Sequence, residues 1–82
     1  MGFQLDLREE VLNRLRRIEG QVRGIQRLVE QGEQCRKVAS QVKAARTALD
    51  AAGKLVLACY LVDSLASDEL TEREAIDLIV KF

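Results

Sequence analysis

Residues 35–59 read CRKVASQVKAARTALDAAGKLVLAC, and this stretch decides the fold. Apolar residues recur in it at alternating steps of three and four: Cys35, Val38, Val42, Ala45, Leu49, Ala52, Val56 and Cys59. This spacing is typical of the a/d seam of an α-helix that packs lengthwise against another helix. From near Glu33 through Leu65, the predicted helix has a length of about 48 Å, at about 1.5 Å per residue.

The preceding segment predicts another long helix, from about Asp6 to just before Gly32. Asp6 is an acceptable N-cap with Glu9 as its capping-box partner, and Gly32 suits the position after the helix C-terminus. Gly20 and Gly24 each weaken a helix by about 1 kcal/mol relative to alanine, and they suggest close approach of another backbone. The apolar stripe of this helix is Val11, Leu15, Ile18, Val22, Ile25 and Val29.

A short third helix is predicted after residues 67–70. Thr71 is its N-cap and Glu74 completes a capping box. The apolar face of this helix is Ala75, Ile76, Ile79 and Val80. We expect it to pack on the ends of the two long helices.

The expected fold is all-α, with a three-helix protomer forming one domain over residues 1–82. Hydrophobic residues make up 48% of the chain, aromatic residues only 4%, and proline and tryptophan are absent, as is typical of long helices packed by alanine, leucine and valine. A chain of 82 residues cannot bury such helices alone, so we expect an antiparallel four-helix-bundle dimer. A second apolar face predicts further assembly to a tetramer: Leu55, Leu57, Leu61 and Val62.

The net charge of zero conceals a separation of charge along the chain. Residues 11–54 hold ten lysines and arginines against four acidic residues, a local charge of +6. Residues 55–82 hold two lysines and arginines against six acidic residues, a local charge of −4. The basic part is either a surface for a polyanion or a solvated helix face.

The composition favours a cytoplasmic protein. Residues 1–10 contain no apolar segment typical of a secretion signal, and charged residues, at 32%, are too evenly spread for a membrane span. In that compartment the two cysteines are expected to be thiols, metal ligands or a redox pair, and not a structural disulfide.

Residues 14–25 (RLRRIEGQVRGI), Cys35 and residues 41–49 (QVKAARTAL) resemble the metal-sensitive and thiol-responsive transcriptional repressors of the CsoR/RcnR family. That family includes copper, nickel, formaldehyde and persulfide sensors. The resemblance implies three-helix protomers that form a tetramer of two four-helix bundles. It also implies operator binding through basic residues of the first two helices, without a helix-turn-helix.

Five basic residues are the candidates for contacting double-stranded operator DNA: Arg14, Arg17, Lys43, Arg46 and Lys54. The arginines are the strongest of these, because a guanidinium binds phosphate or guanine with two parallel hydrogen bonds. The alternative is that some arginines form ion pairs within a helix, for example Arg23 with Glu19.

Cys35 is the candidate sensing residue. It lies near a helix N-terminus beside Arg36 and Lys37, and both features favour the thiolate form of a cysteine. The resemblance implies that a copper sensor would add a histidine and a cysteine of the neighbouring protomer, at the positions of Tyr60 and Ser64. Cu(I) or another thiophilic metal at Cys35 is therefore a candidate inducer, but the histidine and second cysteine that usually complete the site are replaced by Tyr60 and Ser64. The absence of histidine from the chain counts against nickel, cobalt and zinc.

Cys59 is a weaker candidate for the sensing site. The persulfide-responsive branch uses two thiols, and its second cysteine falls at position 64. Because Cys59 shares the predicted seam with Cys35, an interchain disulfide or polysulfide between them is conceivable, and a buried core role is the alternative. Tyr60 either donates a hydrogen bond to Cys35 of the other chain or packs in the core. The formaldehyde-responsive branch expects proline after the first methionine, whereas this chain begins Met1-Gly2-Phe3.

The leading hypothesis is a repressor that releases its operator when a metal ion, reactive sulfur species or electrophile acts at Cys35. The alternative is a structural coiled-coil interaction module that does not bind DNA. A metal-storage bundle would need more thiols. We do not expect an enzyme, because no nucleophile, base and oxyanion-stabilising group occur together.

Overall fold

The computed structural model describes the backbone of residues 5–82 and the side chains of residues 7–82. It contains three helices within that range and no strand: α1 (Leu5–Glu30), α2 (Cys35–Ala66) and α3 (Glu72–Lys81). The chain is long and thin, with extents of 52 × 27 × 12 Å. The all-α, three-helix prediction is confirmed. The predicted N-cap at Asp6 is wrong, because α1 begins at Leu5 and Asp6 lies within the helix. Residues 1–3 lie outside the described residues.

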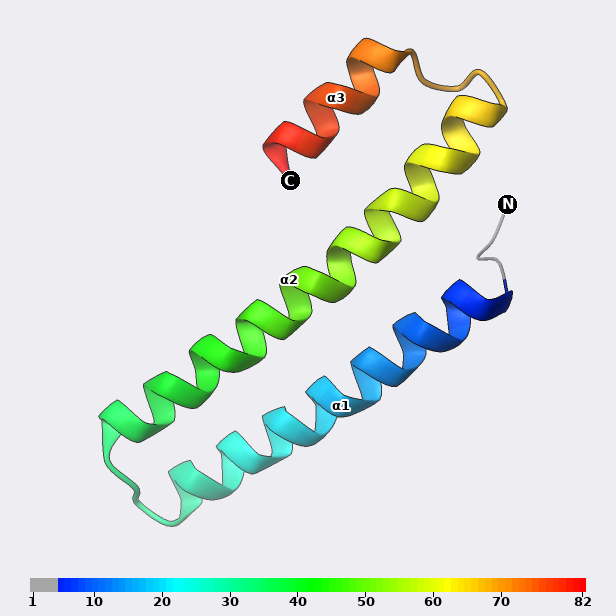
Figure 1. Ribbon diagram of the computed structural model, residues 1–82. Helices are drawn as coiled ribbons and strands as arrows, with labels where there is room; N and C mark the ends of the chain where they lie inside the picture. Colours follow the sequence, from blue (N-terminus) through cyan, green and yellow to red (C-terminus); the bar gives the residue numbers. More distant parts are fainter. Residues whose placement is uncertain (1–4) are drawn as a thin grey trace.

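Helices α1 and α2 form an antiparallel hairpin, and α2 extends beyond α1 at its C-terminal end (Figure 1). The turn between them is a Schellman motif. Gly32 has a positive φ of 70° and donates its N–H to the Val29 carbonyl, while Glu33 donates to the Leu28 carbonyl, both at 3.0 Å. The predicted role of Gly32 is confirmed, whereas α2 begins at Cys35, two residues later than predicted.

The contact between α1 and α2 uses only part of each predicted apolar seam. Val11 and Ile18 of α1 are buried, as are Ala45 and Ala52 of α2. Alanines at this contact allow the two helices to approach closely. No atom within 4 Å would meet a Cβ at Gly20 or Gly24, so the close approach predicted at these glycines is absent within residues 5–82.

The remaining seam residues form an exposed apolar surface that we call the open face. Its members recur at steps of seven on each helix: Leu15, Val22, Val29, Val42, Leu49 and Val56. Leu15 and Val56 line the same hollow, so the antiparallel register places residue 22 level with 49 and residue 29 level with 42. Val22 and Leu49 are 45% and 51% exposed, respectively. A contiguous apolar surface of this kind marks an interaction site.

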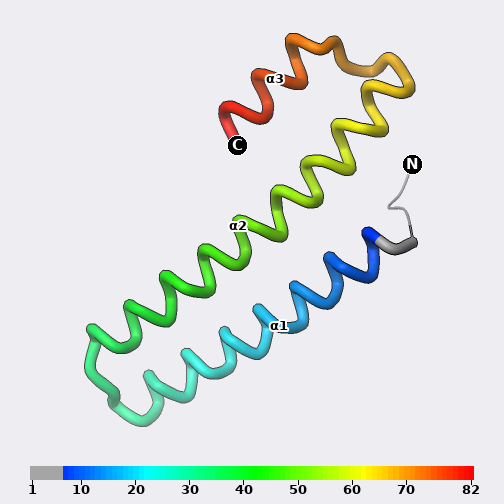
Figure 2. The backbone as a smooth tube through the Cα atoms, in the orientation of Figure 1, coloured from blue at the N-terminus to red at the C-terminus, as the bar shows by residue number. Residues whose placement is uncertain are grey.

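Helix α3 folds back along the C-terminal half of α2, on the side opposite α1 (Figure 2). Within residues 5–82, α3 makes no contact with α1. The expectation that α3 packs on the ends of both long helices is therefore wrong. The cause is the reversal after α2, where Asp68 takes a positive φ of 60° and the N–H groups of Glu69 and Leu70 bond to the Ser64 carbonyl.

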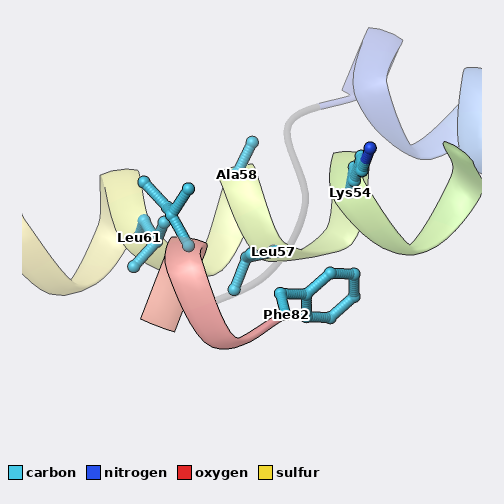
Figure 3. A pocket seen from close by; sticks show the side chains of 6 residues that line it. Lys54, Leu57, Ala58, Leu61 and Phe82 are labelled. Atoms are coloured by element: carbon cyan, nitrogen blue, oxygen red, sulfur yellow. The ribbon is translucent and has the colours of Figure 1, made fainter. Parts of the chain in front are cut away.

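Part of the second apolar face predicted on α2 is covered by α3 of the same chain. Leu61 is buried and Leu57 half-buried, and both line a hollow with Ile79 and Phe82 of the α3 segment (Figure 3). The Phe82 ring contacts Gly53 so closely that a Cβ there would lie 3.1 Å from a ring carbon. Part of the face expected to drive tetramer formation is thus satisfied within the chain, although Val62 stays exposed.

The start of α3 is fixed by the predicted capping box. The Thr71 hydroxyl accepts a hydrogen bond from the Glu74 N–H at 3.2 Å, and the Glu74 carboxylate accepts one from the Thr71 N–H at 3.0 Å. Hydrogen bonds from the Thr71 backbone and hydroxyl lower the pKa of Glu74, because they stabilise its charged form.

This lowered pKa predicts an acid-sensitive α3. A group whose pKa is lower in the folded state stabilises that state above its unfolded pKa, and this stabilisation is lost as the pH falls through the folded value. In an NMR titration we expect the carboxyl carbon of Glu74 to titrate at lower pH in the folded protein than in the urea-unfolded chain. Glu74→Gln should also remove part of the acid-induced loss of helicity. Titration of Glu74 at the same pH in the folded and the unfolded chain would contradict this assignment.

No helix in residues 5–82 is long and apolar enough to span a membrane.

Candidate nucleic-acid interface and sensing thiol

Two of the predicted DNA-binding residues lie together on α1. Arg14 and Arg17 line a shallow polar hollow of about 290 Å³ with Glu10 and Asn13. Steps of three and four along a helix place such residues on one line of its surface. Arg14 Nη2 lies 3.3 Å from Glu10 Oε1. The Arg17 side chain is exposed and makes no hydrogen bond or ion pair with any side chain that the structure describes.

The other three predicted residues lie on α2 in two places. Lys43 and Arg46 are exposed and lie one helical turn apart in its N-terminal half. Lys54 is exposed beside α3, where it lines the hollow that contains Phe82 (Figure 3). Lys54 follows Arg46 by eight positions, which separates their levels by about 12 Å along the helix axis. A single chain therefore brings Arg14 together with Arg17, and Lys43 with Arg46, but does not gather all five.

Ion pairs between residues four positions apart differ from the one expected. Among the side chains of residues 7–82, Glu19 and Arg23 do not pair, whereas three others do: Glu10–Arg14, Glu33–Lys37 and Arg73–Asp77. Glu10 was not among the predicted site residues, although its position four residues before Arg14 is the usual signal for such a pair.

Cys35 is the first residue of α2 and its free thiol is exposed. Of its two basic neighbours, Lys37 pairs with Glu33 at 3.1 Å, so its charge is partly neutralised. Arg36 is exposed and makes no side-chain bond within the described part of the chain. By its heptad position, Cys35 continues the row of Val42, which belongs to the open face.

Cys59 lies on a different row of α2 from Cys35. It is free, half-buried and in line with Ala45 and Ala52, which face α1. The two cysteines therefore belong to the two different rows of the predicted seam. They are 24 residues apart on one helix, about 36 Å, so a disulfide between them within a chain is excluded.

Tyr60 and Ser64, where the resemblance implies histidine and cysteine in a copper sensor, both lie next to the α3 segment. Tyr60 is half exposed and lines a hollow with Glu74 and Leu78. Ser64 is only 2% exposed beneath the turn that leads to α3. Residues 7–82 contain no group of three or more His, Cys, Asp or Glu side chains that would hold a metal ion. The ligands of a single chain therefore do not fit a closed Cu(I) site.

These features define a small all-helical protein with an exposed apolar face, a basic surface and an accessible thiol. Residues 7–82 match the model of the family described as metal-sensitive transcriptional repressors, and the chain belongs to this family.

Similar proteins support the same assignment. The crystal structure of the copper-sensing repressor CsoR with Cu(I) from Geobacillus thermodenitrificans NG80-2 has a TM-score of 0.74 and 31% identity, covering 100% of this chain and 92% of that one. The copper-sensing transcriptional repressors CsoR of Bacillus subtilis and RicR of Mycobacterium tuberculosis are each 45% identical over 42 residues. The uncharacterized protein YrkD of Bacillus subtilis is 39% identical over 61 residues, 66% of this chain and 97% of YrkD.

The alignment with each of the two copper-sensing repressors covers 51% of this chain. It covers 42% of CsoR and 44% of RicR, so this chain spans less than half the length of either relative.

Proposed function

We propose that this protein is a DNA-binding transcriptional repressor that releases its operator when an inducer acts at Cys35. The observation that carries the proposal is the family match over residues 7–82, which includes all three helices apart from the first two residues of α1. Residues 1–82 would form one DNA-binding and sensing domain, without enzymatic activity, in the cytoplasm. A structural coiled-coil module without DNA binding is not favoured, because the named relatives are transcriptional repressors.

The open face supports a dimer as the acting unit. In an antiparallel pairing of two α2 helices about Leu49, Val42 of one copy lies opposite Val56 of the other, so the row is self-complementary. A twofold dimer requires such a surface, and the two hairpins together form a four-helix bundle. Further assembly to a tetramer would use the exposed residues of the α3 segment: Ile76, Ile79, Val80 and Phe82.

The basic hollow remains accessible in such a dimer. On α1, Arg14 precedes Leu15 of the open face, and successive residues turn by about 100° around a helix axis. The line of Arg14 and Arg17 therefore faces away from the dimer contact. Arginines on this line contact phosphates of the operator, and binding of this kind weakens as the salt concentration rises.

The inducer acts at Cys35 because its sulfur is exposed at the end of the hairpin. Cu(I) is a candidate inducer, since the relatives are copper sensors and thiolate is a soft ligand. Because one chain supplies a single thiol there, a reactive sulfur species or an electrophile that modifies one thiol is an equally suitable inducer.

Fluorescence anisotropy with a duplex from the region upstream of the protein's own gene tests DNA binding. We expect binding at low salt that weakens linearly on a double-logarithmic plot. Arg17→Gln should lower the affinity for the duplex about tenfold. It should also reduce the slope of log affinity against log salt concentration by about one for each phosphate that the variant no longer neutralises. Arg73→Gln, in the acidic half, should leave both unchanged. Absence of binding at low salt would contradict the proposal.

A further inference from the structure

We propose that Glu10 acts as an acidic brake on the DNA-binding hollow, lowering its affinity by holding Arg14. This inference rests on the proposed function. Glu10 Oε1 lies 3.3 Å from Arg14 Nη2, and both residues line the hollow that also contains Arg17. Of the two arginines, Arg17 alone has no carboxylate partner among the described side chains.

The ion pair changes what the hollow offers to a phosphate. Two arginines and one carboxylate give a local charge of +1 instead of +2. For Arg14 to bind a phosphate oxygen, its guanidinium must either break its ion pair with Glu10 or bind the carboxylate and the phosphate at once. The negatively charged carboxylate of Glu10 then lies close to the negatively charged phosphate, which is unfavourable. Each cation that reaches a phosphate releases condensed counterions, so a partly neutralised Arg14 contributes less to the affinity and to its salt dependence.

Glu10 has no comparable role in the fold. The Glu10 and Arg14 side chains are 52% and 40% exposed, and exposed pairs of this kind contribute little to stability. The core of α1 comes from a different line of residues, which includes the buried Val11 and Ile18. The brake is therefore separable from folding, and removing its charge leaves the hairpin intact.

The test measures anisotropy with the same duplex over a range of salt concentrations. Glu10→Gln is expected to tighten binding about three- to tenfold near 0.1 M salt and to steepen the salt slope. The matched control is Glu19→Gln, which removes the same charge from an exposed residue of α1 that forms no ion pair within the described side chains. Circular dichroism should be the same for both variants and the wild type.

A double-mutant cycle separates the brake from a general charge effect. Arg14→Gln should weaken binding only slightly in the wild type, and clearly more in the Glu10→Gln background, where the guanidinium is released. If Glu10→Gln and Glu19→Gln tighten binding equally, or if the effect of Arg14→Gln is the same in both backgrounds, the brake is overturned while the repressor proposal stands. If the wild type does not bind DNA at low salt, both proposals are overturned.

Discussion

Replacement of Leu49 by lysine should convert the proposed dimer into monomers. Leu49 is half exposed at the centre of the open face, where the proposed twofold pairing would bring the two copies of the residue together. Two like charges buried there cost several kcal/mol each, so we expect the dissociation constant of the dimer to rise about 1,000-fold or more. Analytical ultracentrifugation over a range of protein concentrations measures this constant directly.

The matched control for Leu49→Lys is Ser40→Lys. Ser40 is an exposed residue of the same helix, and its position is turned about 180° from Leu49. The control should remain dimeric although it gains the same charge. Because each monomer would lack half of the bundle, Leu49→Lys should also lose operator binding and thermal stability. A wild-type protein that is monomeric at micromolar concentration, or an unchanged dissociation constant in Leu49→Lys, would contradict the dimer.

Replacement of Cys35 by alanine should abolish the response to inducer while preserving DNA binding. In the wild type, an effective inducer is expected to lower operator affinity about 5- to 150-fold, the usual range of coupling between two sites. Cys35 is exposed and remote from the core, so the variant should fold normally. The measurement is operator affinity by anisotropy before and after addition of Cu(I), inorganic polysulfide or formaldehyde.

Cys59→Ala is the control for this experiment, because Cys59 lies on the row that faces α1. It should respond to inducer like the wild type. Native mass spectrometry of the treated wild type then distinguishes a bound metal ion from added sulfur atoms on the protein. A Cys35→Ala variant that still releases DNA with every one of these inducers would rule out Cys35 as the sensor.

Most of the local structure could be predicted from the sequence. The steps of three and four predicted both long helices, Gly32 predicted the end of α1, and Thr71 with Glu74 predicted the start of α3. Each of these features depends on residues within about one helical turn of one another. Local hydrogen bonds and backbone preferences therefore specify them without reference to tertiary contacts.

The candidate site was less predictable. The sequence singled out Cys35 and the arginines by residue type and charge, and the structure places Cys35 and Arg17 on exposed surfaces. Periodicity did not reveal that Lys54 lies beside α3 or that Cys59 faces α1. Both positions depend on the direction in which a neighbouring helix approaches, which the spacing of residues along one helix does not specify.

By itself, the sequence determined that this protein consists of three amphipathic helices, with a net positive charge over residues 11–54 and a thiol near the start of the second helix. Only the tertiary structure decided which half of each seam is buried and which forms the open face. The physical reason is that a two-helix contact covers one narrow line of each helix, so a seam with two apolar rows always leaves one row for another surface. The return of α3 along α2 then decided which remaining apolar residues the chain covers itself.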